Sequence, residues 1–183
     1  MVGLRKASAY SKKIVVPYTR KSKRKQKSFI KTVPPQSIIK FSMGSESSFD
    51  KGAFPFQLIL VADEHVQIRG NALEACRQFI NKKLEDSFAG QYLFKVVPYP
   101  HHIQRENKML TGAGADRMQT GMQLSFGRAV GRASIVKPGD EIFFLAFQSK
   151  KAESFARHLL HQIKSKLPGK TKIVSKEIKT VEE

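Results

Sequence analysis

Residues 132–163 read RASIVKPGDEIFFLAFQSKKAESFARHLLHQI, and this stretch predicts a strand, a turn, a strand and a helix in succession. Lys137-Pro138-Gly139-Asp140 places proline and glycine where a tight turn favours them, so residues 132–136 and 141–147 are predicted to be its two strands. Ser149 can cap the helix that follows, because its hydroxyl can accept a hydrogen bond from a main-chain N–H of the first turn. One face of that helix is apolar, with residues three and four apart: Ala152, Phe155, Ala156, Leu159, Leu160 and Ile163.

The first half of the chain shows the same kinds of element. Strands are predicted over residues 37–42, 54–62 and 91–97, and the polar residues 44–52 form the first connection. Asp63 can cap a helix that runs to about residue 86. Its predicted apolar face consists of Ile68, Ala72, Ala75, Cys76, Phe79, Ile80 and Leu84.

Two amphipathic helices can bury their apolar faces only against a sheet, so the predicted fold class is α+β, a two-layer sandwich of two helices on a mainly antiparallel sheet. Pro168-Gly169 ends the second helix, and a last short strand is predicted over residues 171–175. We expect a basic arm over residues 1–35, one α+β domain over residues 36–176, and a tail over residues 177–183.

The formal net charge of +18 is unevenly distributed. Residues 1–45 hold twelve Lys or Arg and no acid, whereas residues 46–104 hold six basic and seven acidic residues. A basic arm beside a neutral body is typical of a protein that binds a polyanion such as RNA. Cys76 is the only cysteine, so no intramolecular disulfide can form, and we expect it to be a buried, inert thiol. No apolar run approaches the ~20 residues that span a bilayer, so no membrane partner is expected.

Residues 105–131 follow neither helical nor strand periodicity over their first half, and they contain five glycines. A connection this long is typical of a functional loop, whose central part we place at residues 105–122. Its cations, amides and methionines suit RNA, which presents phosphates and flat bases. Together with the arm, the predicted RNA-binding residues are Lys12, Lys13, Tyr18, Arg20, Lys21, Lys23, Arg24, Lys25, His101, His102, Arg105, Asn107, Lys108, Arg117, Gln119 and Arg128.

Other chemistries find weaker support in the sequence. Residues 111–116 lack the third glycine of a dinucleotide-binding loop and the lysine of a nucleotide-triphosphate loop, so no cofactor is expected. His158 and His161 lie one turn apart, but no cysteine pair or carboxylate completes a zinc ligand set, so no metal is expected. An enzyme could use His102, Glu106 and Asp116. A glycine-rich loop, however, is a poor support for side chains whose positions must be held as precisely as catalysis requires. We expect no catalytic residue.

Residues 105–110 (Arg-Glu-Asn-Lys-Met-Leu) and 113–122 (Ala-Gly-Ala-Asp-Arg-Met-Gln-Thr-Gly-Met) closely resemble the signature loop of a universal large-subunit ribosomal protein family, called L-sixteen in bacteria and L-ten-e in archaea and eukaryotes. Residues 17–20, 67–75 and 167–173 also resemble landmarks of that family. The resemblance implies an α+β sandwich with a hammerhead-like β insertion.

The same resemblance implies a function. It implies a non-enzymatic constituent of the large ribosomal subunit in the cytoplasm, bound to large-subunit ribosomal RNA near the peptidyl-transferase centre. Implied partners are neighbouring ribosomal proteins, transfer RNA acceptor ends and assembly factors, with no homo-oligomer. Arg69, Lys170 and Lys172 lie in resembling segments and are assigned to RNA. The transfer RNA loop would consist of Lys108, Met109, Leu110, Thr111, Gly112, Ala113, Gly114, Ala115, Asp116, Arg117, Met118, Gln119, Thr120 and Gly121.

The chain departs from the family pattern after this loop. The family usually has a basic residue before Gly-Lys-Pro, whereas this chain has Gln123, Leu124 and, further on, Ala129. Two other hypotheses stay open from the sequence. One is an RNA-modifying or RNA-processing enzyme that uses the glycine loop as a lid over His102 and Asp116, and the other is an RNA chaperone that binds through the arm alone.

Overall fold

The computed structural model describes residues 6–8, 11, 14, 16–20, 30–106 and 127–177. Its elements follow one another as β1 (Ser42–Gly44), α1 (Glu46–Asp50), β2 (Phe56–Ala62), β3 (Val66–Arg69), α2 (Gly70–Phe88), β4 (Tyr92–Val96), β5 (His102–Glu106), β6 (Arg128–Val136), β7 (Glu141–Phe147), α3 (Lys150–Ile163), the 3₁₀ turn η3 (Lys164–Lys166) and β8 (Thr171–Glu177).

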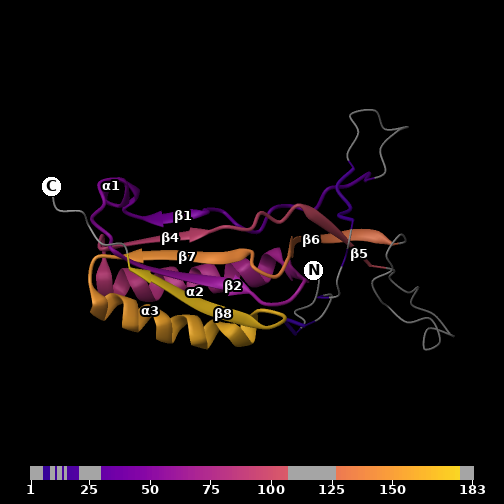
Figure 1. Ribbon diagram of the computed structural model, residues 1–183. Helices are drawn as coiled ribbons and strands as arrows, with labels where there is room; N and C mark the ends of the chain where they lie inside the picture. The colour runs from indigo at the N-terminus through magenta and orange to yellow at the C-terminus, as the bar shows by residue number, and fades with distance from the viewer. Residues whose placement is uncertain are drawn as a thin grey trace.

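Five strands form an antiparallel sheet in the order β1-β4-β7-β2-β8, and α2 and α3 lie together against it (Figure 1). The register places Leu145 of β7 opposite both Leu58 and Phe94, and all three side chains are fully buried. They belong to one core with the apolar faces of α2 and α3. Burial of this kind contributes about 25 cal/mol per Å² of apolar surface removed from water, so the core carries most of the stability. The predicted α+β sandwich is confirmed.

The opposite face of this sheet has a smaller apolar cluster. Phe54, Leu93 and Ala146 are buried there, and the ring of Phe49 in α1 meets the ring of Phe144 edge to face at a centroid distance of 5.7 Å. Strand β7 is therefore buried on both faces, which explains why its sequence is apolar at nearly every position.

A second sheet of three antiparallel strands, in the order β3-β6-β5, extends from one end of the sandwich (Figure 1). Gln104 pairs with Gly131 and Arg105 with Ala129, so Val130 is an extra residue that forms a bulge in β6. The small sheet positions the long connection, because β5 ends at Glu106 and β6 begins at Arg128. It agrees with the separate β insertion that the resemblance implies.

Most predicted elements are confirmed, with shifted bounds. The predicted strands over residues 54–62, 91–97, 141–147 and 171–175 correspond to β2, β4, β7 and β8. The second helix begins at Lys150, and the hydroxyl of Ser149 accepts from the N–H of Ala152 at 3.3 Å, as predicted for a cap. The predicted strand over residues 132–136 begins four residues earlier, at Arg128.

Three predictions about the first half were wrong. Only Ser42 of the predicted strand 37–42 is in a strand, and residues 44–52 include the helix α1. Asp63 does not cap the first helix, because residues 66–69 form β3 by pairing with β6, and α2 begins at Gly70. Ile68 is consequently buried in the small sheet and not on the helix. Ala75, which was predicted on the apolar helix face, is exposed, whereas Leu73, which was not predicted there, is buried on it.

Cys76 is fully buried on α2, as expected, and burial raises the pKa of its thiol to about 12. Across the described ranges, none of the helices combines the length and the apolarity that crossing a membrane requires.

Candidate nucleic-acid interface

The basic arm is attached to the outer edge of β5 at Tyr18. The main-chain N–H of Tyr18 donates to Nδ1 of His102 at 2.8 Å, and the N–H of Ile103 donates to the carbonyl oxygen of Tyr18 at 3.0 Å. Pairing to an edge strand satisfies main-chain groups that would otherwise need water. Part of the predicted arm, residue 18, therefore lies on the surface of the domain.

The side chain of Tyr18 also contacts β5. The guanidinium carbon of Arg105 lies 3.7 Å from the centroid of the Tyr18 ring, and both side chains are half-buried. A cation over an aromatic face at this distance is attracted by the ring quadrupole and loses rotational freedom. Arg105 lies one residue before the end of β5, so this stack is at the base of the connection that begins at residue 107.

His102 acts as an acceptor for the arm rather than as an exposed binding group. Its residue surface is 3% exposed, so the predicted direct contact of this ring with RNA is not supported by the structure. Burial first, and then the nearby charges of His101 and Arg105, lower the pKa of His102 to about 4. The ring is thus neutral at pH 7, and because Nδ1 accepts from Tyr18, Nε2 carries the proton.

The arm meets the opposite edge of the small sheet at Ser11. The N–H of Gln67, in β3, donates to the carbonyl oxygen of Ser11 at 3.3 Å. Within the sheet, the amide of Gln104 donates to Oε1 of Gln67 at 3.0 Å, and both side chains are buried. The outer edges of β3 and β5 are therefore both in contact with the first twenty residues of the chain.

Arg132 of β6 holds the other end of the arm. Its Nε donates to the carbonyl oxygen of Pro34 at 2.7 Å, and its terminal nitrogen lies 3.5 Å from Oε1 of Gln36 and 3.4 Å from the hydroxyl of Tyr99. The Tyr99 ring stacks on Phe41 with a centroid distance of 5.8 Å. Along the sequence, contacts to β3 and β5 thus precede the basic run of residues 21–29, and the contact to β6 follows it.

The small sheet gathers most of the predicted residues that the structure describes. Tyr18, His101, His102, Arg105 and Arg128 lie on it or against it, Arg20 follows Tyr18 by two residues, and the buried Arg69 ends β3. The other predicted residues lie outside the described residues: Lys12, Lys13, Lys21, Lys23, Arg24, Lys25, Asn107, Lys108, Arg117 and Gln119, together with the whole loop 108–121.

Lys170 immediately precedes β8, and Lys172 is the second residue of that strand. Nζ of Lys172 is 2.7 Å from a carboxylate oxygen of Asp63, and Nζ of Lys170 is 3.8 Å from one of Glu64. Exposed pairs of this kind contribute about 0–1 kcal/mol, so the two lysines could exchange their carboxylates for phosphates at low cost.

Sequence reasoning missed Arg132, Gln67 and Gln104. Arg132 and Gln104 carried no signal beyond being polar residues near the loop, and Gln67 was assigned to a helix. The alternation of Val66-Gln67-Ile68-Arg69 could have indicated a strand. Among residues 30–106 and 127–177, no three metal-ligating side chains gather, and a ring nitrogen of His158 lies 3.0 Å from the amide nitrogen of Gln162.

Comparisons with known proteins agree on one family. The model of the family described as ribosomal protein L16p/L10e matches residues 17–174. A protein named large ribosomal subunit protein uL16 from Nanoarchaeum equitans is 38% identical over 182 residues, which cover 98% of this chain and 97% of that protein. Proteins of the same name from Pyrobaculum calidifontis and Archaeoglobus fulgidus are 42% and 41% identical, over 86% and 93% of this chain and 85% and 92% of their own lengths.

The matched region begins at Pro17, next to the residue that pairs with β5, and ends inside β8. It therefore includes α1, α2, α3 and all of the two sheets except residues 175–177. With this coverage and these identities, the chain belongs to the ribosomal protein L16p/L10e family.

Proposed function

We propose that this protein binds large-subunit ribosomal RNA near the peptidyl-transferase centre and supports the positioning of transfer RNA through residues 105–122. One observation carries the proposal: the small sheet holds the arm at Tyr18 and also contains both strands from which the long connection starts and ends. The two segments that contain most of the predicted RNA-binding residues are therefore both attached to the small sheet.

Family membership establishes the general role of the protein. The protein is a ribosomal protein, a structural constituent rather than an enzyme, and its place is the cytoplasmic ribosome. The relatives carry the name of a large-subunit protein, which is why the proposal assigns this chain to that subunit. Membership of this family therefore excludes the hypothesis, open from the sequence alone, that the protein is an RNA-processing enzyme.

Electrostatics and the attachment of the arm support contact with RNA. Each phosphate that a lysine or arginine neutralises releases condensed counterions, and this release drives binding. Contacts at Tyr18 and at Pro34 hold the basic run of residues 21–29 on the small sheet at both of its ends in the sequence.

The proposed contribution to transfer RNA is positional. Residues 107–126 connect the ends of β5 and β6, so their two ends are fixed by the pairing of Glu106 with Arg128. Held at both ends on the small sheet, this connection would bring its cations and apolar side chains to an acceptor end. No proton transfer or covalent step is assigned to the protein.

Ultraviolet crosslinking in growing cells, with both the RNA positions and the crosslinked peptides mapped, tests the proposal. We expect peptides from residues 12–25 and 105–128 to crosslink to large-subunit RNA around the peptidyl-transferase centre and to transfer RNA ends. Crosslinks scattered over many RNAs, or confined to precursor RNA, would overturn it and favour an RNA chaperone.

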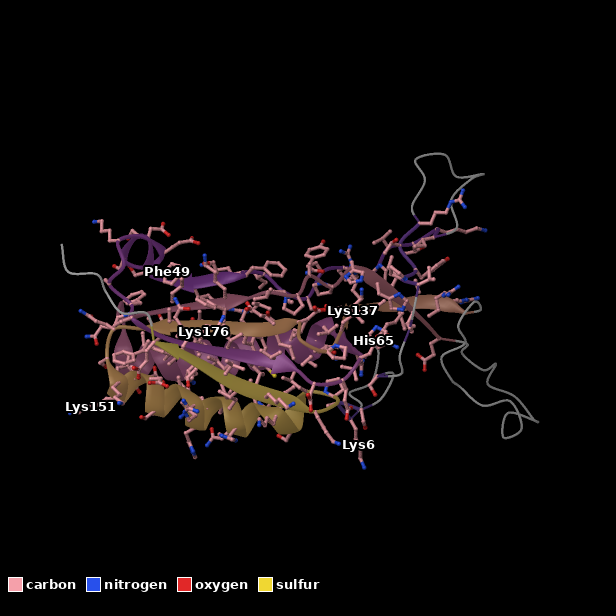
Figure 2. All side chains as sticks on the ribbon, in the orientation of Figure 1. Lys6, Phe49, His65, Lys137, Lys151 and Lys176 are labelled. Carbon is pink, nitrogen blue, oxygen red and sulfur yellow. The ribbon has the colours of Figure 1, made fainter. Side chains whose placement is uncertain are left out.

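A charge-matched pair of variants sharpens the same test. The double variant Arg24→Ala, Lys25→Ala removes two charges from the arm, and Lys150→Ala, Lys151→Ala removes two from α3, where Lys151 lies far from the small sheet (Figure 2). We expect the first variant to be depleted from large subunits on sucrose gradients and the second to remain. Equal depletion would contradict a specific role of the arm.

A further inference from the structure

Tyr18 is uncharged, yet its ring is stacked against a cation that the proposed function assigns to RNA. The guanidinium carbon of Arg105 lies 3.7 Å from the centroid of the Tyr18 ring. The main chain of Arg105 is held by β5 itself, so what the ring sets is the orientation of the guanidinium.

Tyr18 is itself held by β5 and not by RNA. Its N–H donates to His102 at 2.8 Å, and its carbonyl oxygen accepts from Ile103 at 3.0 Å. His102 and Ile103 are both buried, so these partners have fixed positions in the small sheet. Strand β5 therefore holds Tyr18 beside the guanidinium of Arg105, which the same strand carries.

We propose that Tyr18 is a positioning residue whose ring aligns the guanidinium of Arg105 for a phosphate contact, so that an uncharged side chain affects how many phosphates the protein neutralises. This inference rests on the proposed function. It assigns Tyr18 a role distinct from stacking on a base, because its ring is already covered on one face by Arg105.

The dependence of binding on salt distinguishes positioning from direct contact. The slope of log K against log salt is proportional to the number of phosphates neutralised, with about 0.7–0.9 per phosphate. An aromatic side chain that only stacks on a base contributes affinity without changing this slope. Loss of the phosphate contact of one arginine should lower the magnitude of the slope by about one.

The experiment measures binding of the full-length protein to deproteinised large-subunit RNA from the same organism, between about 50 and 200 mM KCl. We expect Tyr18→Ala to bind roughly tenfold more weakly at the low-salt end, with the magnitude of the slope reduced by about one. Tyr18→Phe should match the unsubstituted protein, because it keeps the ring that stacks on Arg105. Phe49→Ala removes an aromatic ring at the opposite end of the sandwich and should leave the slope unchanged (Figure 2).

A double-mutant cycle that combines Tyr18→Ala with Arg105→Gln tests whether Tyr18 acts through Arg105. We expect the effect of Tyr18→Ala on the slope to be smaller when Arg105 is already replaced, because coupled residues are not additive. Circular dichroism establishes whether each variant is folded, and exchange of the Ile103 amide, which donates to Tyr18, establishes whether the arm is still attached. Tyr18→Leu serves as the variant if Tyr18→Ala does not fold.

Weaker binding with an unchanged slope would overturn the inference and make Tyr18 a direct base contact. Unchanged affinity and slope would overturn it as well. Failure of the unsubstituted protein to bind this RNA would instead contradict the proposed function, so the two failures are distinguishable.

Discussion

The N–H of Tyr18 and Nδ1 of His102 are joined by a hydrogen bond of 2.8 Å across 84 positions of sequence. This bond requires a neutral imidazole, because a protonated ring donates from both nitrogens and leaves the N–H of Tyr18 without an acceptor. The attachment of the arm to the small sheet is therefore linked to the protonation of one buried side chain.

The first prediction concerns pH. The pKa of His102 is about 4 in the folded protein and has an ordinary value of 6.5, so the unfolded or detached state binds the proton first. The attachment is fully stable above about pH 6.5 and loses stability as the pH falls toward 4, by roughly 3 kcal/mol in all. The charges of His101 and Arg105 face the same ring and contribute to this shift.

A single fluorophore can measure this effect. The chain contains no tryptophan, so Tyr18→Trp would report on this site alone. We expect its emission to shift toward that of exposed indole between pH 6.5 and 4, before the far-ultraviolet circular dichroism changes. The same variant carrying His102→Asn should show no such transition, and emission constant down to pH 4 would contradict the prediction.

A second prediction concerns Gly44, where β1 turns into α1 with φ of +92°. A Cβ at this position would lie 2.1 Å from the carbonyl oxygen of Tyr92, a main-chain atom of β4 that cannot move without breaking the sheet. We expect Gly44→Ala to lower the free energy of unfolding by about 3 kcal/mol or more in urea titrations. Gly52→Ala has a similar φ of +77° and nothing within 4 Å, so it should cost only about 1 kcal/mol.

A third prediction compares two ion pairs. Arg77 donates two hydrogen bonds to Glu74 at 2.6 and 2.7 Å and also contacts the sulfur of Met43, so it links α2 to β1. Both side chains of this pair are only about one-tenth exposed. We expect Arg77→Met to lower the free energy of unfolding by about 1–3 kcal/mol, because it leaves a poorly solvated carboxylate with one partner fewer.

The matched control is Lys95→Met, which breaks a pair of equal length, 2.6 Å, between exposed side chains. Lys95→Met should lower the free energy of unfolding by no more than about 0.5 kcal/mol, since solvent screens this pair. Urea titration of both variants measures the difference. Equal costs would show that Arg77 is solvated in the same way as Lys95.

A fourth prediction concerns the thiol of Cys76. Burial raises its pKa to about 12, and only a thiolate is a good nucleophile. We expect no reaction with Ellman's reagent at pH 8 in the native protein and full reaction of one thiol in denaturant. Rapid reaction without denaturant would mean that α2 opens locally.

The elements that were predictable from the sequence are those whose burial matches their periodicity. Strand β7 is apolar throughout because both of its faces are buried, and α3 has a serine cap and a regular apolar face. Strand β5 escaped prediction because most of its buried residues are polar: His102, Gln104 and Glu106. Polar residues that find partners only after folding give no hydrophobic signal beforehand.

The chemistry of the candidate interface was predictable, but its assembly was not. Basic and aromatic residues in the arm indicated RNA binding. The attachment of Tyr18 to β5, however, uses main-chain groups that every residue possesses, and it joins segments far apart in sequence. Composition therefore identified which residues could bind RNA, whereas the fold was needed to show which of them lie together.

The strand order of the large sheet has a consequence for synthesis. Strand β2 lies between β7 and β8, the last two strands to leave a ribosome, although it is itself among the first. At about 5–20 residues per second, residue 177 follows residue 62 by on the order of 10 s. For most of that interval, until β7 is complete at residue 147, the strongly apolar sequence Phe-Gln-Leu-Ile-Leu-Val-Ala of β2 has neither neighbour, which makes each newly made chain a natural client of chaperones that shield unpaired strands.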